Sequence, residues 1–184
     1  GYVPDVMAKV KEYGIILNVN PQRLVREKEY IQDYGREAEA FMMPVKKWLD
    51  NGFTVVGHFE GGAVGTSFND LIRREVNGRV VLPDQRLDRV VVMKLFTTWA
   101  PQYMLKEKEL GSLELGKMAD FTVLDKDFFT IPDTDIPSIR PQMTVVGGIT
   151  RYVNQDLAKK WGTEPVGYQF PSGSYPWRTG GGAD

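Results

Sequence analysis

Two short apolar runs limit what this chain can fold into. Residues 15–20 (IILNVN) and residues 53–57 (FTVVG) are apolar on both faces, as in a parallel sheet covered by helices on both sides. Helices are predicted around them, at residues 6–13, 24–50 (with breaks at Gly35 and Pro44), 68–75 and 87–105. Two parallel strands rarely form a stable sheet alone, because each strand needs neighbours on both edges. The pattern therefore predicts a piece of a larger α/β fold.

The second half of the chain has a different pattern of predicted elements. Residues 119–124 and 143–153 are predicted strands, joined by a proline-rich connection. Residues 154–184 are rich in Pro and Gly, so we predict an irregular C-terminal arm. Its aromatic residues, Trp161, Tyr168, Tyr175 and Trp177, are interpreted as anchors on another surface. These shifts divide the chain into residues 1–106, 107–153 and 154–184.

Two further local predictions concern the helical stretch 87–105. Asp84 follows Pro83, which favours a place at a helix N-terminus. Phe96, Trp99 and Tyr103 recur at helical spacing and are predicted to lie in the core.

Composition excludes several classes of function. The 184 residues carry a net charge of −1, which gives no general attraction to nucleic acid or to an acidic membrane surface. No apolar run is long enough to span a bilayer, and we expect a cytoplasmic protein. The first residues, GYVPD, resemble a cut end rather than a natural start. The absence of Cys and the single histidine, His58, rule out a Cys-ligated metal and a histidine-rich cluster within this chain.

Residues 111–125 (GSLELGKMADFTVLD) carry a family resemblance. They resemble the C-terminal signature of the amidohydrolase superfamily, where the chain returns from a barrel into a small β-sandwich. Residues 143–153 resemble the closing strands of that sandwich, and residues 83–87 resemble the segment before the last barrel helix. The spacing in residues 125–132 is most similar to the subgroup of N-substituted formamide deformylases and other long-chain amidohydrolases. The resemblance covers residues 7–153.

The resemblance implies an incomplete enzyme. The fold would be the C-terminal β/α units of a TIM-like (β/α)₈ barrel plus part of a β-sandwich, completed by another polypeptide that carries the N-terminal barrel strands. The function would be that of part, or a small subunit, of a metal-dependent hydrolase that cleaves the C–N bond of a small amide-like substrate. A divalent metal, zinc first, is expected, with its ligands supplied mainly by the other polypeptide and none assigned here. We expect an oligomer, inactive as this chain alone.

The resemblance also points to candidate site residues, because (β/α)₈ active sites lie at the carboxyl ends of the strands. The family carries Gly-Ser-Asp after strand eight, and the Asp binds metal and acts as base. Here the run is Gly57-His58-Phe59-Glu60, so that position falls on Phe59. His58 and Glu60 are therefore the catalytic candidates. At or after the end of the strand that resembles strand seven, three amide residues are candidates for substrate binding: Asn18, Asn20 and Gln22.

Alternatives remain open for these residues. His58 can equally be hydrogen-bonded inside a loop, and Asn or Gln at strand ends often form turns. Arg23 and Arg26 can pair with an anionic substrate, although a solvated role fits Arg26 better. Phe59 favours two other functions: a non-catalytic subunit that completes a barrel, or a lyase or decarboxylase on the same scaffold.

Overall fold

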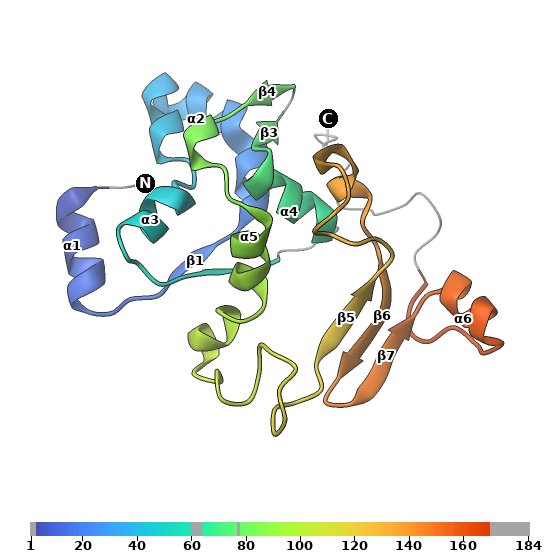
Figure 1. The fold of residues 1–184 in the computed structure, drawn as a ribbon. Helices are drawn as coiled ribbons and strands as arrows, with labels where there is room; N and C mark the ends of the chain where they lie inside the picture. Colours follow the sequence, from blue (N-terminus) through green and yellow to red (C-terminus); the bar gives the residue numbers. More distant parts are fainter. Residues whose placement is uncertain (1–2, 60–63, 77, 170–184) are drawn as a thin grey trace.

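The computed structural model describes residues 3–59, 64–76 and 78–169 as a mixed α/β structure with three small sheets (Figure 1). The helices are α1 (Pro4–Glu12), α2 (Glu27–Tyr34), α3 (Val45–Asp50), α4 (Val64–Ile72), α5 (Arg89–Phe96) and α6 (Gln155–Trp161). The strands are β1 (Leu17–Val19), β2 (Val55–Gly57), β3 (Glu75–Val76), β4 (Arg79–Val80), β5 (Phe121–Leu124), β6 (Pro141–Val146) and β7 (Ile149–Val153). Short 3₁₀ helices are η1 (Pro21–Arg26), η2 (Arg36–Phe41), η3 (Pro83–Gln85), η4 (Ala100–Met104) and η5 (Asp133–Ser138).

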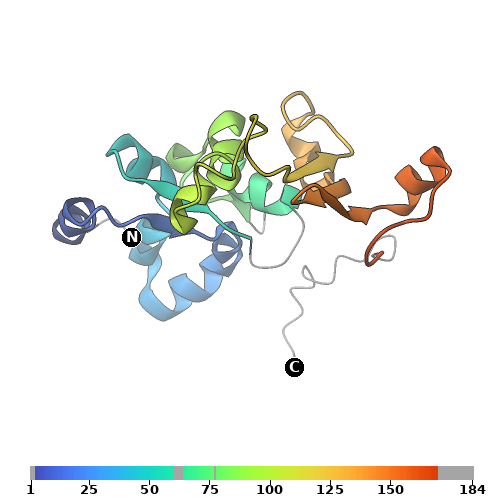
Figure 2. The same cartoon turned by 90° about the horizontal axis from the view of Figure 1, so that it is seen from below.

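The two apolar runs form a parallel strand pair, as predicted. In β1 and β2, Leu17 lies opposite Val55 and Val19 lies opposite Gly57. Leu17, Val19 and Val55 turn toward the main apolar core, whereas Asn18 between them is exposed. Figure 2 shows α5 on one side of the pair and the light-blue segment that holds α2 and η2 on the other. One face of the pair therefore packs into the main core, and the other carries the exposed Asn18 beside Val56, which is 1% exposed.

A buried arginine ties the core to the loop before α3. Arg74 is fully buried, and its guanidinium donates hydrogen bonds to the carbonyl oxygens of Val81 at 2.7 Å, Met43 at 3.1 Å and Met42 at 2.9 Å. Burial lowers the pKa of Arg74 to about 10, so the side chain keeps its charge at neutral pH. The carbonyls belong to two segments, residues 42–43 and residue 81, which one rigid, fork-shaped donor joins.

The predicted helix at 68–75 is displaced. It begins at Val64 and ends at Ile72, because Arg74 takes a left-handed φ of 52° that no helix continues. Glu75 then belongs to strand β3.

The predicted helix at 87–105 is split into α5 and η4, and Pro101 lies in the second piece. The N-cap of α5 is Asp88, whose carboxylate accepts from the Val91 amide at 2.9 Å, whereas Asp84 lies in the first turn of η3. Phe96 and Trp99 pack against the core as predicted, but Tyr103, in η4 beyond the break in the helix, is 58% exposed.

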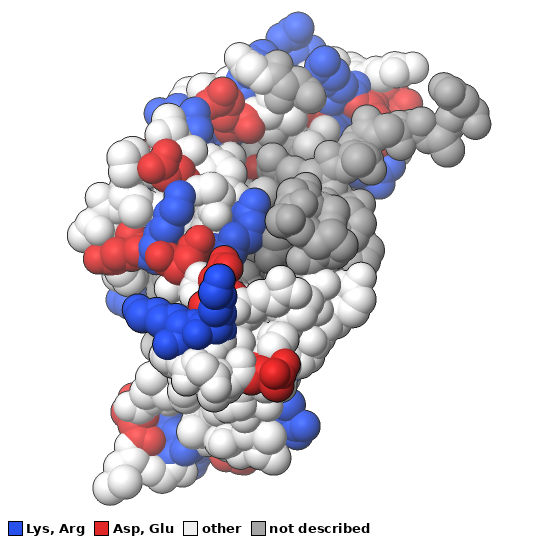
Figure 3. All heavy atoms as spheres, turned by 90° about the vertical axis from the view of Figure 1, so that its right-hand side faces the viewer, with Lys and Arg blue, Asp and Glu red and all other residues white. Residues whose placement is uncertain are grey.

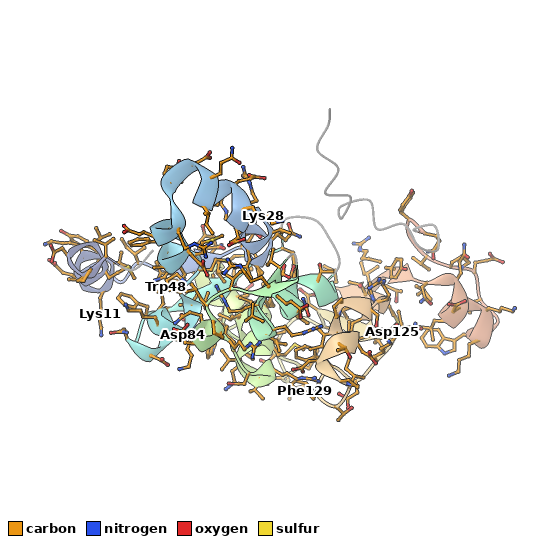
Figure 4. The ribbon with its side chains drawn as sticks, turned by 90° about the horizontal axis from the view of Figure 1, so that it is seen from above. Lys11, Lys28, Trp48, Asp84, Asp125 and Phe129 are labelled. Atoms are coloured by element: carbon orange, nitrogen blue, oxygen red, sulfur yellow. The ribbon has the colours of Figure 1, made fainter. Side chains whose placement is uncertain are left out.

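The second half forms an antiparallel sheet in the order β5-β6-β7. Its turn at Gly147-Gly148 is held by Asp120, whose carboxylate accepts from the Gly147 amide at 2.5 Å. Phe128, Ile136 and Ile139, in the connection between β5 and β6, are buried in the main core. This sheet therefore contacts the first half mainly through its proline-rich connection. Figure 4 shows that Asp125 and Phe129, at the start of this connection, lie on the other side of the molecule from Lys11 and Trp48.

The expectation of an irregular arm from residue 154 is wrong for its first part. Asn154 caps α6 by accepting from the Leu157 amide at 2.8 Å, and Gly162 ends the helix with a φ of 67°. Val166 then pairs with Val153 at the end of β7 through two backbone hydrogen bonds of 3.0 and 3.1 Å. Trp161 and Tyr168 are exposed, while Tyr175 and Trp177 lie outside the described residues. Their role as anchors stays a prediction.

Replacing Arg74 by Ala is expected to destabilise the protein by about 3 kcal/mol, because three buried carbonyl groups lose their donor and a cavity remains. The matched control is Arg73→Ala, which removes a partly exposed pair with Glu75 and is expected to cost less than about 1 kcal/mol. Urea unfolding of both variants measures the difference. Equal midpoints would show that the Arg74 contacts contribute little.

Candidate functional site

His58 lies at the carboxyl end of the parallel strand pair. Its backbone amide donates to the carbonyl of Val19 at 3.1 Å, which extends the ladder by one residue. Because side chains alternate along a strand, His58 is on the face of Asn18, and its Nδ1 contacts the Asn18 Oδ1. The structure therefore brings together two residues that lie 40 positions apart and that the sequence singled out separately.

The contact with Asn18 favours one tautomer of the neutral imidazole. An amide oxygen only accepts hydrogen bonds, so Nδ1 of His58 must carry the proton that it donates. In the neutral ring, Nε2 then keeps its lone pair. A side chain held in this tautomer can accept a proton or bind an electrophile through Nε2.

A cavity of about 990 Å³ opens beside this pair. Asn18, Asn20 and His58 supply its polar end at the strand termini, and Arg23 and Glu37 add charges of opposite sign. The rest of the wall is largely apolar and aromatic, and comes from α2, η2, the loop before α3, α3 itself and η4: Tyr30, Tyr34, Phe41, Met42, Met43, Trp48 and Tyr103. In Figure 4, Trp48 lies where α3 meets the light-blue segment that holds α2. An apolar pocket with a few convergent polar groups is the usual form of a small-molecule site.

The other predicted site residues have different positions. Asn20 is 5% exposed, and its Oδ1 accepts from the Gln22 amide at 3.0 Å, so this side chain caps η1 while it also lines the cavity. Gln22 is partly buried and lies outside the set of lining residues. Glu60 falls outside the described residues. Substrate binding by Asn20 and Gln22, and catalysis by His58 and Glu60, stay predictions.

Phe59 turns away from the cavity. Its ring stacks on Phe96 with the centroids 4.4 Å apart and lies 6.0 Å from the ring of Phe68. Phe96 also covers Gly57, where an added Cβ would come within 2.6 Å of that ring. Residue 59 thus belongs to the aromatic packing on the helix-covered face, and residue 58 is the one on the open face.

The aromatic wall of the cavity was missed in the sequence. Tyr30 and Tyr34 are one turn apart on α2, with ring centroids 6.1 Å apart, a spacing that gives a weak signal for one helix face. Trp48 and Tyr103 have no such signal, because they reach the cavity only through the tertiary fold.

The described residues do not fit a metal site by themselves. Among residues 3–59, 64–76 and 78–169, no group of three or more His, Cys, Asp or Glu side chains comes together. His58 offers one imidazole, and a zinc site needs about three or four ligands. On the face of the molecule drawn in Figure 3, Lys and Arg side chains lie among Asp and Glu side chains.

Comparisons with known proteins identify the family of the chain. The sequence profile described as the amidohydrolase family matches residues 2–152, and the chain belongs to that family. The chain is also 31% identical over 86 residues to a 5-methylthioadenosine/S-adenosylhomocysteine deaminase from Thermodesulfovibrio yellowstonii. That match covers 45% of this chain and 20% of the deaminase, so the chain spans about a fifth of its relative. In the part of the chain that the structure describes, none of the helices is both long and apolar enough to cross a membrane.

Replacing Gly57 by Ala is expected to cost about 1–3 kcal/mol, because the new methyl group collides with the Phe96 ring. Adding Phe96→Leu should recover part of that loss, so the double variant is expected to be more stable than the two single costs predict. Thermal unfolding of the four proteins gives the coupling energy. Strict additivity would contradict the packing described here.

Proposed function

We propose that this chain supplies the last two β/α units of a (β/α)₈ barrel and part of the adjoining β-sandwich in a metal-dependent amidohydrolase. The enzyme would hydrolyse the C–N bond of a small amide-like substrate. The observation that carries the proposal is the Asn18–His58 pair, which lies in a cavity at the carboxyl ends of two parallel strands. That is the end at which barrel enzymes hold their catalytic residues. Membership of the amidohydrolase family supports the reaction class.

The proposal includes a partner. Within the described residues, β1 and β2 pair only with each other, so each has an edge that a closed barrel would fill. We propose that another polypeptide, either a separate subunit or a cleavage product, carries the N-terminal strands in a stable oligomer. It would also supply most ligands of a divalent metal, zinc first, because the described part of this chain has no such group.

His58 would handle the proton in this scheme. Asn18 holds the Nδ1 proton and leaves the Nε2 lone pair available on the open face of the strands. Glu60, two residues on, is the alternative base. Phe59 would only support this end of β2, since its ring packs on Phe96.

A second function is favoured by the same ring stack. If a carboxylate at position 59 is essential to the family's chemistry, its replacement by Phe59 fits a subunit that completes a barrel without catalysing. A lyase or decarboxylase reaction that needs no carboxylate there is a third candidate. Both alternatives predict that the assembly does not hydrolyse the amide substrate, whereas our proposal predicts that it does.

The proposal is tested first by denaturing intact-mass analysis and metal determination on one sample of the natural assembly. We expect a second, larger polypeptide in fixed ratio and a stoichiometric divalent metal, together with hydrolysis of amides or N-substituted formamides. A single species of 20.8 kDa that contains no metal and hydrolyses none of these substrates would refute the proposal.

Within that assembly, we expect at least one of the variants His58→Asn and Glu60→Gln to lower kcat at least about 100-fold without loss of folding. The reason is that either His58 or Glu60 moves the proton in the reaction. The far-ultraviolet circular dichroism spectrum checks folding. Unchanged turnover in both variants would favour the non-catalytic subunit instead.

Replacing Asn18 by Leu is expected to lower kcat about 10-fold with little change in KM, since His58 loses the acceptor that fixes its tautomer. Asn18→Asp keeps an acceptor oxygen and should retain most of the activity. If the two variants behaved alike, Asn18 would have no role in orienting the imidazole.

A further inference from the structure

Arg23 is the basic side chain that lines the cavity. It lies in η1, immediately after β1, and its backbone amide donates to the Asn20 carbonyl at 3.2 Å. Within the described residues its guanidinium has no ion pair. Arg26, one turn further on, lies outside the cavity, and its guanidinium is bound to Glu29 at 2.7 Å. The structure thus separates two arginines that are alike in sequence.

The remaining charge in the cavity does not neutralise Arg23. Glu37 comes from η2, and no ion pair between these two side chains forms. Between the polar strand ends and these charges, the wall is apolar and aromatic, including Tyr30 and Trp48. A ligand that fills this space would meet His58 and Asn18, apolar surface and a guanidinium.

We infer that Arg23 selects amide-like substrates that carry a carboxylate on the part of the molecule that does not react. This inference rests on the proposed function and names the substrate class for the same cavity. A guanidinium binds a carboxylate through two parallel N–H···O bonds, which gives both affinity and orientation. The apolar wall would hold the aromatic or aliphatic body between the carboxylate and the amide, and Glu37 would disfavour a second anionic group.

A binding experiment tests the inference without requiring turnover. Hydrocinnamate and benzylacetone have nearly the same shape and differ in a carboxylate against a methyl ketone. Calorimetric titration of the purified protein is expected to give about 10-fold tighter binding of hydrocinnamate. Arg23→Gln should remove that preference, and Arg26→Gln, the matched control, should keep it. Glu37→Gln should increase the preference, because it removes the negative charge from the cavity.

Three results would overturn the inference: equal affinity of the two probes for the unaltered protein, no binding of either at millimolar concentration, or equal behaviour of the Arg23 and Arg26 variants. In the active assembly, Arg23→Gln should raise KM about 10-fold for a carboxylate-bearing amide and leave KM unchanged for its methyl ester. Probe discrimination without hydrolysis would refute the proposed function alone. Hydrolysis without discrimination would refute the role of Arg23 alone.

Discussion

The hydrogen bonds of Arg74 hold the first half of the chain together. One buried guanidinium reaches the carbonyls of Met42 and Met43 on one side and of Val81 on the other. Met42 and Met43 also line the cavity, so the same contacts set the position of its wall. A buried cation is costly unless its donors are used, and here each of its three nitrogens donates to a carbonyl. The shape of the cavity therefore depends on an interaction in the core rather than on the site itself.

The alternation of side chains along β2 decides which residue can act in the site. His58 and Phe59 are neighbours in sequence, yet one faces Asn18 and the other stacks on Phe96. Comparison of motifs placed Phe59 where the family carries a catalytic Asp. The strand geometry gives the cavity face to His58, and position 59 lies on the opposite face against Phe96.

The features of the fold that could be predicted from the sequence are those that depend on a local pattern of residues. The apolar runs predicted both parallel strands, and Gly35 predicted the break between α2 and η2. The left-handed φ of Arg74, which ends α4 early, has no signal in a non-glycine residue. The five 3₁₀ helices among the described residues are too short to show a period. In the site, Asn18 and His58 were found because they are polar residues at the ends of apolar runs, whereas Trp48 and Tyr103 join them only through tertiary packing.

The pairing of Val166 with Val153 limits which edge of the second sheet can accept another strand. Backbone groups of Val153 at the end of β7 are already bonded to Val166, and the Gln169 amide nitrogen also donates to the Val153 carbonyl at 3.1 Å. An additional strand cannot pair along the whole of that edge. Among the described residues, the outer edge of β5 has no such cover, so it is the edge that an added strand can pair with along its whole length. Any partner that extends it must approach beside β5, and pairing of two copies through their β7 edges is blocked at one end.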